Sequence, residues 1–91
     1  MAADDLTLLY FAWVRDRVGV GQEVIAHPGP DCTVAALLDI LAAGDDAHAA
    51  AFTDRARLRA ALDQNYVSLE SPIGAAHELA IFPPVTGGDT P

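Results

Sequence analysis

The stretch near the C-terminus has the residue types that most directly suggest a chemical role. It contains two prolines and, further on, two glycines. Pro cannot donate a sheet hydrogen bond, and Gly has no Cβ to clash with the walls of a narrow channel. The six residues from 83 to 88 span about 20 Å when extended, so this stretch could enter a partner protein. A frayed terminus is the alternative. The stretch consists of Phe82, Pro83, Pro84, Val85, Thr86, Gly87 and Gly88.

The other side chains that commonly carry chemistry form no recognisable site in the sequence. His27, His48 and His77 are far apart and lack metal-ligand spacing, so we expect no metal site. Cys32 lies just before a predicted helix, whose N-terminus could lower the pKa of the thiol. An incidental or structural cysteine is the favoured interpretation. The C-terminal stretch is therefore the main candidate.

The charge balance limits which partners fit. The 91-residue chain has five basic residues, all arginine, and 13 acidic residues, which gives a formal net charge of −8. Nucleic-acid phosphates and anionic membrane surfaces both attract basic side chains, so this composition argues against either as a partner. A basic surface on a partner protein would be complementary to the chain.

Length and cysteine content restrict the class of protein further. Ninety-one residues make one small domain with little room for a deep active site of its own. One cysteine excludes a disulfide within the chain and a four-cysteine metal site. The N-terminus resembles no secretory signal, and the longest apolar run, Leu8 to Val14, is far shorter than the roughly 20 residues of a membrane span. We therefore expect a cytoplasmic protein whose function is shared with a partner.

The hydrophobic pattern predicts a central strand near the N-terminus and one main helix. Residues 6–14 are apolar on both alternating faces, as in a central strand, with Phe11 and Trp13 on one of them. One helix can cover only one face of such a strand, so the other face needs another cover. Thr33 can cap the main helix, and Gly44 suits the position just past its end.

Shorter segments complete the predicted order of elements. Residues 54–62 are ambiguous, because their alanines allow a helix while Arg55, Arg57 and Arg59 alternate as on a solvated strand face. The remaining assignments are a connector at 15–21, strands at 22–26, 66–69 and 78–82, a short helix at 47–52 and a turn at 71–74. This order predicts an α+β domain over residues 1–82, with a mixed sheet packed on one principal helix, and an extended tail over 83–91.

Three segments of the sequence resemble a known family. They are residues 9–16, residues 33–37 at the start of the main helix, and residues 80–88, where Ala-Ile-Phe-Pro-Pro-Val-Thr-Gly-Gly is nearly the family's complete C-terminal signature. Over about residues 6–88 the chain is similar to MoaD, the small subunit of molybdopterin synthase. That family comprises ubiquitin-like sulfur carriers with the β-grasp fold. The resemblance implies that Leu58 to Leu62 is a strand.

The resemblance also implies a role for the tail. An E1-like adenylating enzyme would use ATP to activate the carboxylate of Gly88, and sulfur delivery would convert it to a thiocarboxylate. Residues 82–87 would bind the large subunit, where the sulfur would pass to cyclic pyranopterin monophosphate to form molybdopterin. The chain would bind no cofactor itself, and the large subunit of the heterotetramer would supply the catalytic groups.

The last residues depart from the family pattern. In this sequence the carbonyl of Gly88 is bonded to Asp89, and Thr90 and Pro91 follow. Gly88 cannot be adenylated unless that bond is cleaved. The favoured interpretation is that a peptidase trims residues 89–91. Two alternatives are that this protein has lost the carrier role, or that the three residues are foreign to the natural chain. The family also has Gly where this chain has Ala76, so we expect a different turn there.

Two other functions fit parts of the sequence. A related sulfur carrier could serve another pathway, such as thiamine or cysteine biosynthesis, although the Pro-Pro-Val-Thr stretch suits thiamine carriers poorly. Alternatively, a ubiquitin-like interaction module could bind partners noncovalently, with its tail blocked by residues 89–91. Phe82 is expected either at the edge of the core or in the partner interface.

Overall fold

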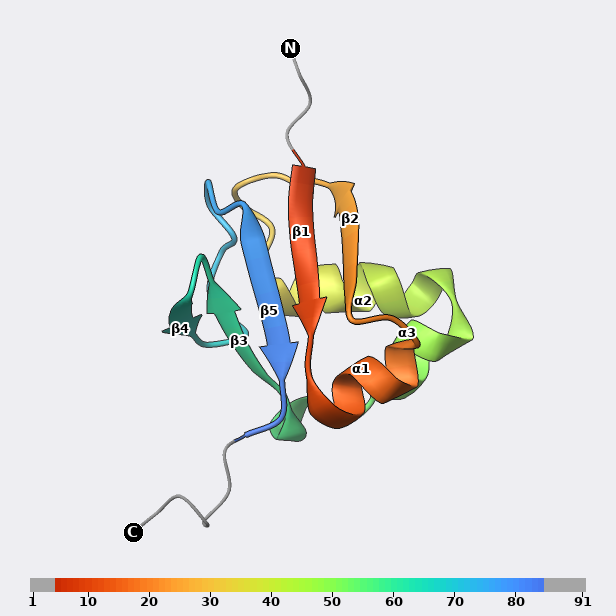
Figure 1. Cartoon of the computed structure of the whole chain (residues 1–91). Helices are drawn as coiled ribbons and strands as arrows, with labels where there is room; N and C mark the ends of the chain where they lie inside the picture. The colour runs from red at the N-terminus through yellow and green to blue at the C-terminus, as the bar shows by residue number, and fades with distance from the viewer. Residues whose placement is uncertain (1–4, 85–91) are drawn as a thin grey trace, which may run out of the picture.

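The computed structural model describes residues 5–84, which form one sheet with helices packed against it (Figure 1). The strands are β1 (Asp5–Tyr10), β2 (Gln22–Ala26), β3 (Arg59–Leu62), β4 (Asn65–Val67) and β5 (Glu78–Phe82). The helices are α1 (Ala12–Val18), α2 (Val34–Gly44) and α3 (Asp46–Ala51), and a 3-10 turn, η1 (Arg55–Arg57), precedes β3.

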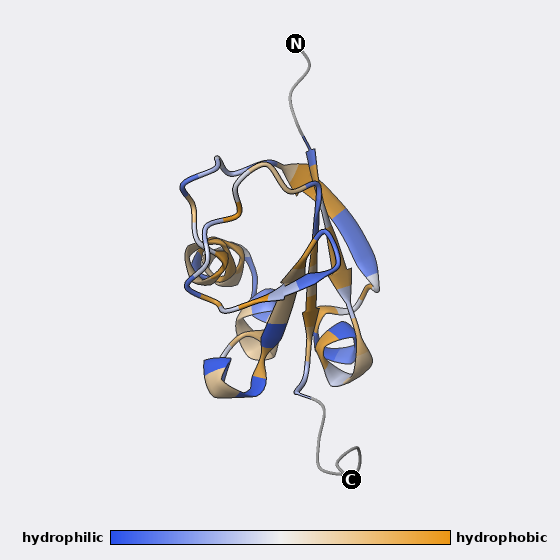
Figure 2. Cartoon of the chain, turned by 90° about the vertical axis from the view of Figure 1, so that its left-hand side faces the viewer, coloured by the Kyte–Doolittle hydropathy of each residue, from blue (hydrophilic) through white to orange (hydrophobic). Residues whose placement is uncertain are grey.

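The strands form a single mixed sheet in the order β2-β1-β5-β3-β4. β1 and β5 are parallel neighbours in its interior, and the other pairs are antiparallel. α2 lies on one side of the sheet, whereas α1 lies at the end where β5 finishes, on the other side (Figures 1 and 2). The predicted α+β fold, a mixed sheet packed on one principal helix, is confirmed.

One apolar core lies between the sheet and α2. Alternate residues of β1 and β5 are buried there, as the two-residue period of a strand requires. The largest fully buried side chains include Leu6, Leu8, Tyr10, Leu37, Leu38, Phe52, Leu79 and Ile81. Because this core anchors β1 and β5, the chain leaves β5 from a fixed position.

Side-chain caps set the limits of α2 and α3. The Thr33 hydroxyl accepts a hydrogen bond from the amide of Ala36 at 3.1 Å, as predicted for the cap of the main helix. Gly44 belongs to α2 instead of following it, because the next residue, Asp45, is the one with an extended backbone. Asp45 also caps α3 by accepting from the amide of His48 at 2.8 Å. The predicted short helix is present one residue earlier than expected.

The prediction of one strand over residues 6–14 is wrong beyond Tyr10. The backbone turns at Ala12, which has a φ of 54°, and α1 continues into the segment predicted to be a connector. The buried residues of α1, Val14 and Val18, are four positions apart. This helical spacing is hidden in the sequence because the first of the two valines also closes a long apolar run.

The ambiguous stretch before β3 contains both a turn and a strand. The strand implied by the family resemblance is confirmed, but it starts at Arg59, one residue later than expected. The prediction that three arginines alternate on a strand face is wrong, because Arg55 and Arg57 lie in η1. After β3, Asp63 and Gln64 have φ values of 49° and 73°, which forms the tight hairpin turn to β4.

The turn before β5 has its positive φ at a glycine. The φ of Gly74 is 64°, whereas Ala76, the position where the family resemblance implies a glycine, is buried and has no positive φ. The carboxylate of Asp63 accepts hydrogen bonds from the amides of His77 and Glu78, both at 3.0 Å. A side chain of the neighbouring hairpin therefore holds the start of β5.

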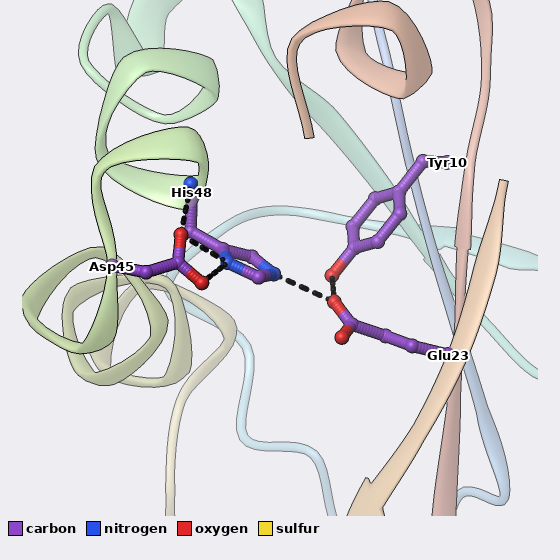
Figure 3. Close-up of polar contacts among 4 residues, drawn as sticks. All are labelled: Tyr10, Glu23, Asp45 and His48. Atoms are coloured by element: carbon purple, nitrogen blue, oxygen red, sulfur yellow. Dashed lines mark hydrogen bonds and ion pairs between the residues drawn. The ribbon is translucent and has the colours of Figure 1, made fainter. Parts of the chain in front are cut away.

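A polar network joins α3 to β1 and β2 (Figure 3). In the ring of His48, Nε2 lies 2.6 Å from the carboxylate of Glu23 and Nδ1 lies 2.8 Å from that of Asp45. The hydroxyl of Tyr10 donates to the same Glu23 oxygen at 2.6 Å. Carboxylates only accept, so the doubly protonated imidazole satisfies both contacts. Burial by itself lowers the pKa of His48, but the hydrogen bonds to Glu23 and Asp45 outweigh it and raise the pKa above its ordinary 6.5.

We expect the protein to lose stability as the pH rises through the raised pKa of His48. The stability that the charged His48 ring contributes is fully present below the unfolded-state pKa of 6.5. It is lost as the ring loses its proton in the folded protein. A charged hydrogen bond that is partly screened by solvent contributes about 1 kcal/mol. Urea unfolding should show this loss as the pH rises above 6.5 in the wild type and not in His48→Gln. An equal loss in both proteins would show that another group is responsible.

Candidate partner-binding face and tail

The tail begins directly from an interior strand of the sheet. Phe82 is the last residue of β5 and lies opposite Arg59 in β3. Pro83 and Pro84 follow it outside any strand, since neither has an N–H to continue the ladder. The other residues predicted to act, Val85, Thr86, Gly87 and Gly88, lie outside the described residues, as do residues 89–91.

Three aromatic side chains gather beside the start of the tail, on the face of the sheet opposite α2. Phe11 is 48% exposed and Tyr66 is 81% exposed, whereas Phe82 is half-buried. The rings of Tyr66 and Phe82 are 5.7 Å apart and tilted by 45°, a favourable aromatic arrangement. We call Phe11, Tyr66 and Phe82 the aromatic face; they line a hollow together with Ala61, Gln64 and Ala80.

The strand register explains why these side chains share one face. Alternate residues of β5 enter the core, which leaves Ala80 and Phe82 pointing to the opposite side. Ala61 lies opposite Ala80 in one neighbouring strand and opposite Tyr66 in the other. The two alanines therefore form a low floor, with larger aromatic rings around it.

The sequence located this face only in part. Phe82 was expected at the core edge or in an interface, and it lies half-buried on the aromatic face. The prediction that Phe11 and Trp13 share a strand face is wrong, because Phe11 precedes α1 and Trp13 lies within it. Tyr66 was not singled out; the signal for it was its alternation with Val67, which packs against the core.

The arginines differ in their contacts. The guanidinium of Arg55 is held within the fold, since it donates to the carboxylate of Asp39 at 2.8 Å. In contrast, the exposed side chains of Arg17 and Arg57 lie over the ring of Trp13, with guanidinium carbons 4.8 and 5.4 Å from its centroid. These distances fall within the range of cation–π contacts.

The structure supports no second reactive centre in the part of the chain it describes. Burial raises the pKa of the Cys32 thiol, which is the opposite of activation. Over residues 5–84, no group of three or more His, Cys, Asp or Glu side chains is arranged to hold a metal ion. No helix in this range is both long and apolar enough to cross a membrane. The aromatic face and the tail therefore form the candidate site.

A mixed sheet on one principal helix, with the tail starting from an interior strand, defines a ubiquitin-like β-grasp protein. The chain belongs to the ThiS family, whose model matches residues 8–88.

Individual relatives cover almost the whole chain. It is 42% identical to the molybdopterin synthase sulfur carrier subunit of Escherichia coli over 83 residues, which is 91% of this chain and 99% of that one. The subunit of the same name from Haemophilus influenzae is 36% identical with the same coverage. The solved structure of SAMP1 from Haloferax volcanii is 26% identical, with a TM-score of 0.67, and the match covers 92% of this chain and 99% of that one.

Proposed function

We propose that this chain is the sulfur carrier subunit of a molybdopterin synthase. The observation that carries the proposal is its 42% identity to the Escherichia coli subunit of that name, over 99% of that subunit. The motif Phe-Pro-Pro-Val-Thr-Gly-Gly, which ends at Gly88, supports the same function.

In this proposal the reacting group is the carboxylate of Gly88. A peptidase cleaves the bond to Asp89, and an E1-like enzyme then uses ATP to activate the freed carboxylate. Sulfur delivery forms a thiocarboxylate, and the sulfur passes to cyclic pyranopterin monophosphate in the large subunit. This chain contributes the carrier group and binds no cofactor, and the large subunit contributes the acid–base groups of the synthase heterotetramer in the cytoplasm.

The aromatic face supports the docking part of the proposal. Its rings lie next to the last residue of β5, so a partner that covers them also receives the start of the tail. Burial of exposed aromatic surface is a strong driving force for association. Pro83 and Pro84 restrict the backbone at the point where the tail leaves the sheet.

Binding to two purified partners from the same organism tests the pathway. We expect a stable complex with the molybdopterin synthase large subunit and none with the thiazole-forming enzyme of thiamine biosynthesis, measured by gel filtration. The opposite preference would contradict the proposal and favour a sulfur carrier of the thiamine pathway. Binding to neither enzyme would favour a noncovalent interaction module.

A further inference from the structure

The arginines of this acidic chain are gathered in two short segments. Residues 12–18 and 54–59 hold all five arginines and two aspartates, a net charge of +3, whereas the rest of the chain has eleven acidic residues and no lysine or arginine. The two segments form α1 and the junction of η1 with β3, which lie near the end of β5 in both Figure 1 and Figure 2. The two segments that lie near the start of the tail are therefore positively charged, although the protein as a whole is acidic.

Two of these arginines converge on the only tryptophan of the chain. Arg17 follows Trp13 by four positions in α1, and Arg57 reaches the same ring from η1. The indole is itself packed against the core. We call these three residues, Trp13, Arg17 and Arg57, the arginine–tryptophan ledge. The ledge joins two elements that are far apart in the sequence. The cation–π contacts restrict where both guanidinium groups can lie.

The guanidinium groups of the ledge retain their capacity to bind an anion. Over residues 5–84, the one arginine in an ion pair is Arg55, and the guanidinium groups of Arg17 and Arg57 donate no hydrogen bond in this part of the chain. The acidic neighbours in the two segments, Asp16 and Asp54, are exposed and form no ion pair with them there. A guanidinium presents a planar fork of N–H donors that matches a carboxylate.

The ledge borders the aromatic face. Arg59 lies two residues after Arg57 and lines a hollow together with Tyr66 and Phe82. At the other side, Phe11 precedes Trp13 by two residues. A partner that covers the aromatic face and receives the tail must therefore also lie close to the ledge.

We infer that the ledge binds an acidic segment of the large subunit, whose carboxylates pair with Arg17 and Arg57. The inference rests on the proposed function, because it describes part of that partner's surface. A basic segment at this place would be repelled, and an apolar one would bury guanidinium groups without acceptors. Composition alone pointed to a basic partner surface, whereas the ledge requires an acidic one locally.

A pair of substitutions that removes the two charges tests this inference. We expect Arg17→Gln with Arg57→Gln to raise the Kd for the purified large subunit about tenfold at low salt, and the difference to shrink at high salt. The matched control is Ala43→Glu with Ala75→Glu, two exposed positions, which changes the net charge by the same −2. The control should bind within about twofold of the wild type. Circular dichroism of each variant checks that it folds.

Each outcome bears on a distinct claim. If the wild type binds the large subunit and the glutamine variant binds equally well, the ledge inference fails and the proposed function stands. If the control weakens binding as much as the glutamine variant, only overall charge matters, and the inference also fails. If the wild type does not bind, the proposed function and the ledge inference both fail.

As a second measurement, acrylamide should quench the emission of Trp13 less in the complex than in the free protein, with Trp13→Phe as the blank.

Discussion

A chain that ends at Gly88 is expected to gain sulfur at its C-terminus when it is incubated with an E1-like adenylating enzyme, ATP and a sulfur donor. The chain that continues to Pro91 is expected to gain none, because its Gly88 carbonyl is part of an amide and offers no carboxylate for adenylation. The effect is all or none, since no alternative geometry restores the missing group. Intact-mass measurement detects the exchange of one oxygen for sulfur.

A chain that ends at Gly87 is the control for this experiment. Its free carboxylate belongs to Gly87 and so lies one residue earlier than that of Gly88. Sulfur uptake by this chain would show that any free C-terminal glycine is sufficient. Its failure to take up sulfur would show that the carboxylate must be that of Gly88. Sulfur uptake by the chain ending at Pro91, with residues 89–91 still present, would contradict the assignment of Gly88 as the carrier group.

Removal of the aromatic rings is expected to abolish most of the affinity for the large subunit. Tyr66→Ala and Phe82→Ala should each raise the Kd by about 30-fold, because aromatic residues at the centre of an interface commonly contribute 2 kcal/mol or more. Tyr66 is the sharper test, since an 81% exposed side chain contributes little to folding. Isothermal titration calorimetry measures both constants.

The matched control for the aromatic face is Ile40→Ala. Ile40 is 59% exposed and belongs to α2, on the other side of the sheet, so its truncation should leave the Kd unchanged. Equal affinity of Tyr66→Ala and the wild type would show that the large subunit does not cover the aromatic face.

The elements that could be predicted from the sequence are those fixed by neighbouring residues. The start of α2 follows from the cap formed by Thr33, and the end of β5 follows from the two prolines after Phe82. The α+β class follows from the order of such elements. The sequence predicted for the same reason that the tail follows the last strand, but the interior position of that strand depends on its pairing with β1 and β3.

The features that escaped prediction depend on contacts between distant segments. α1 was missed because the apolar run 6–14 has the composition of a strand, and its helical turn is stabilised by packing on α3 and the sheet. The contact of Trp13 with Arg57 joins residues from two separate elements. The hydrogen bond between His48 and Glu23 likewise spans 25 positions. No local pattern encodes either contact.

Sulfur transfer in a reconstituted reaction tests the central claim most directly. The chain ending at Gly88 is first loaded as the thiocarboxylate, then mixed with the large subunit and cyclic pyranopterin monophosphate, without any other sulfur source. We predict that molybdopterin appears while the chain returns to the mass of its free carboxylate. A loaded chain that keeps its sulfur, with no molybdopterin formed in the presence of an active large subunit, would contradict the proposed function.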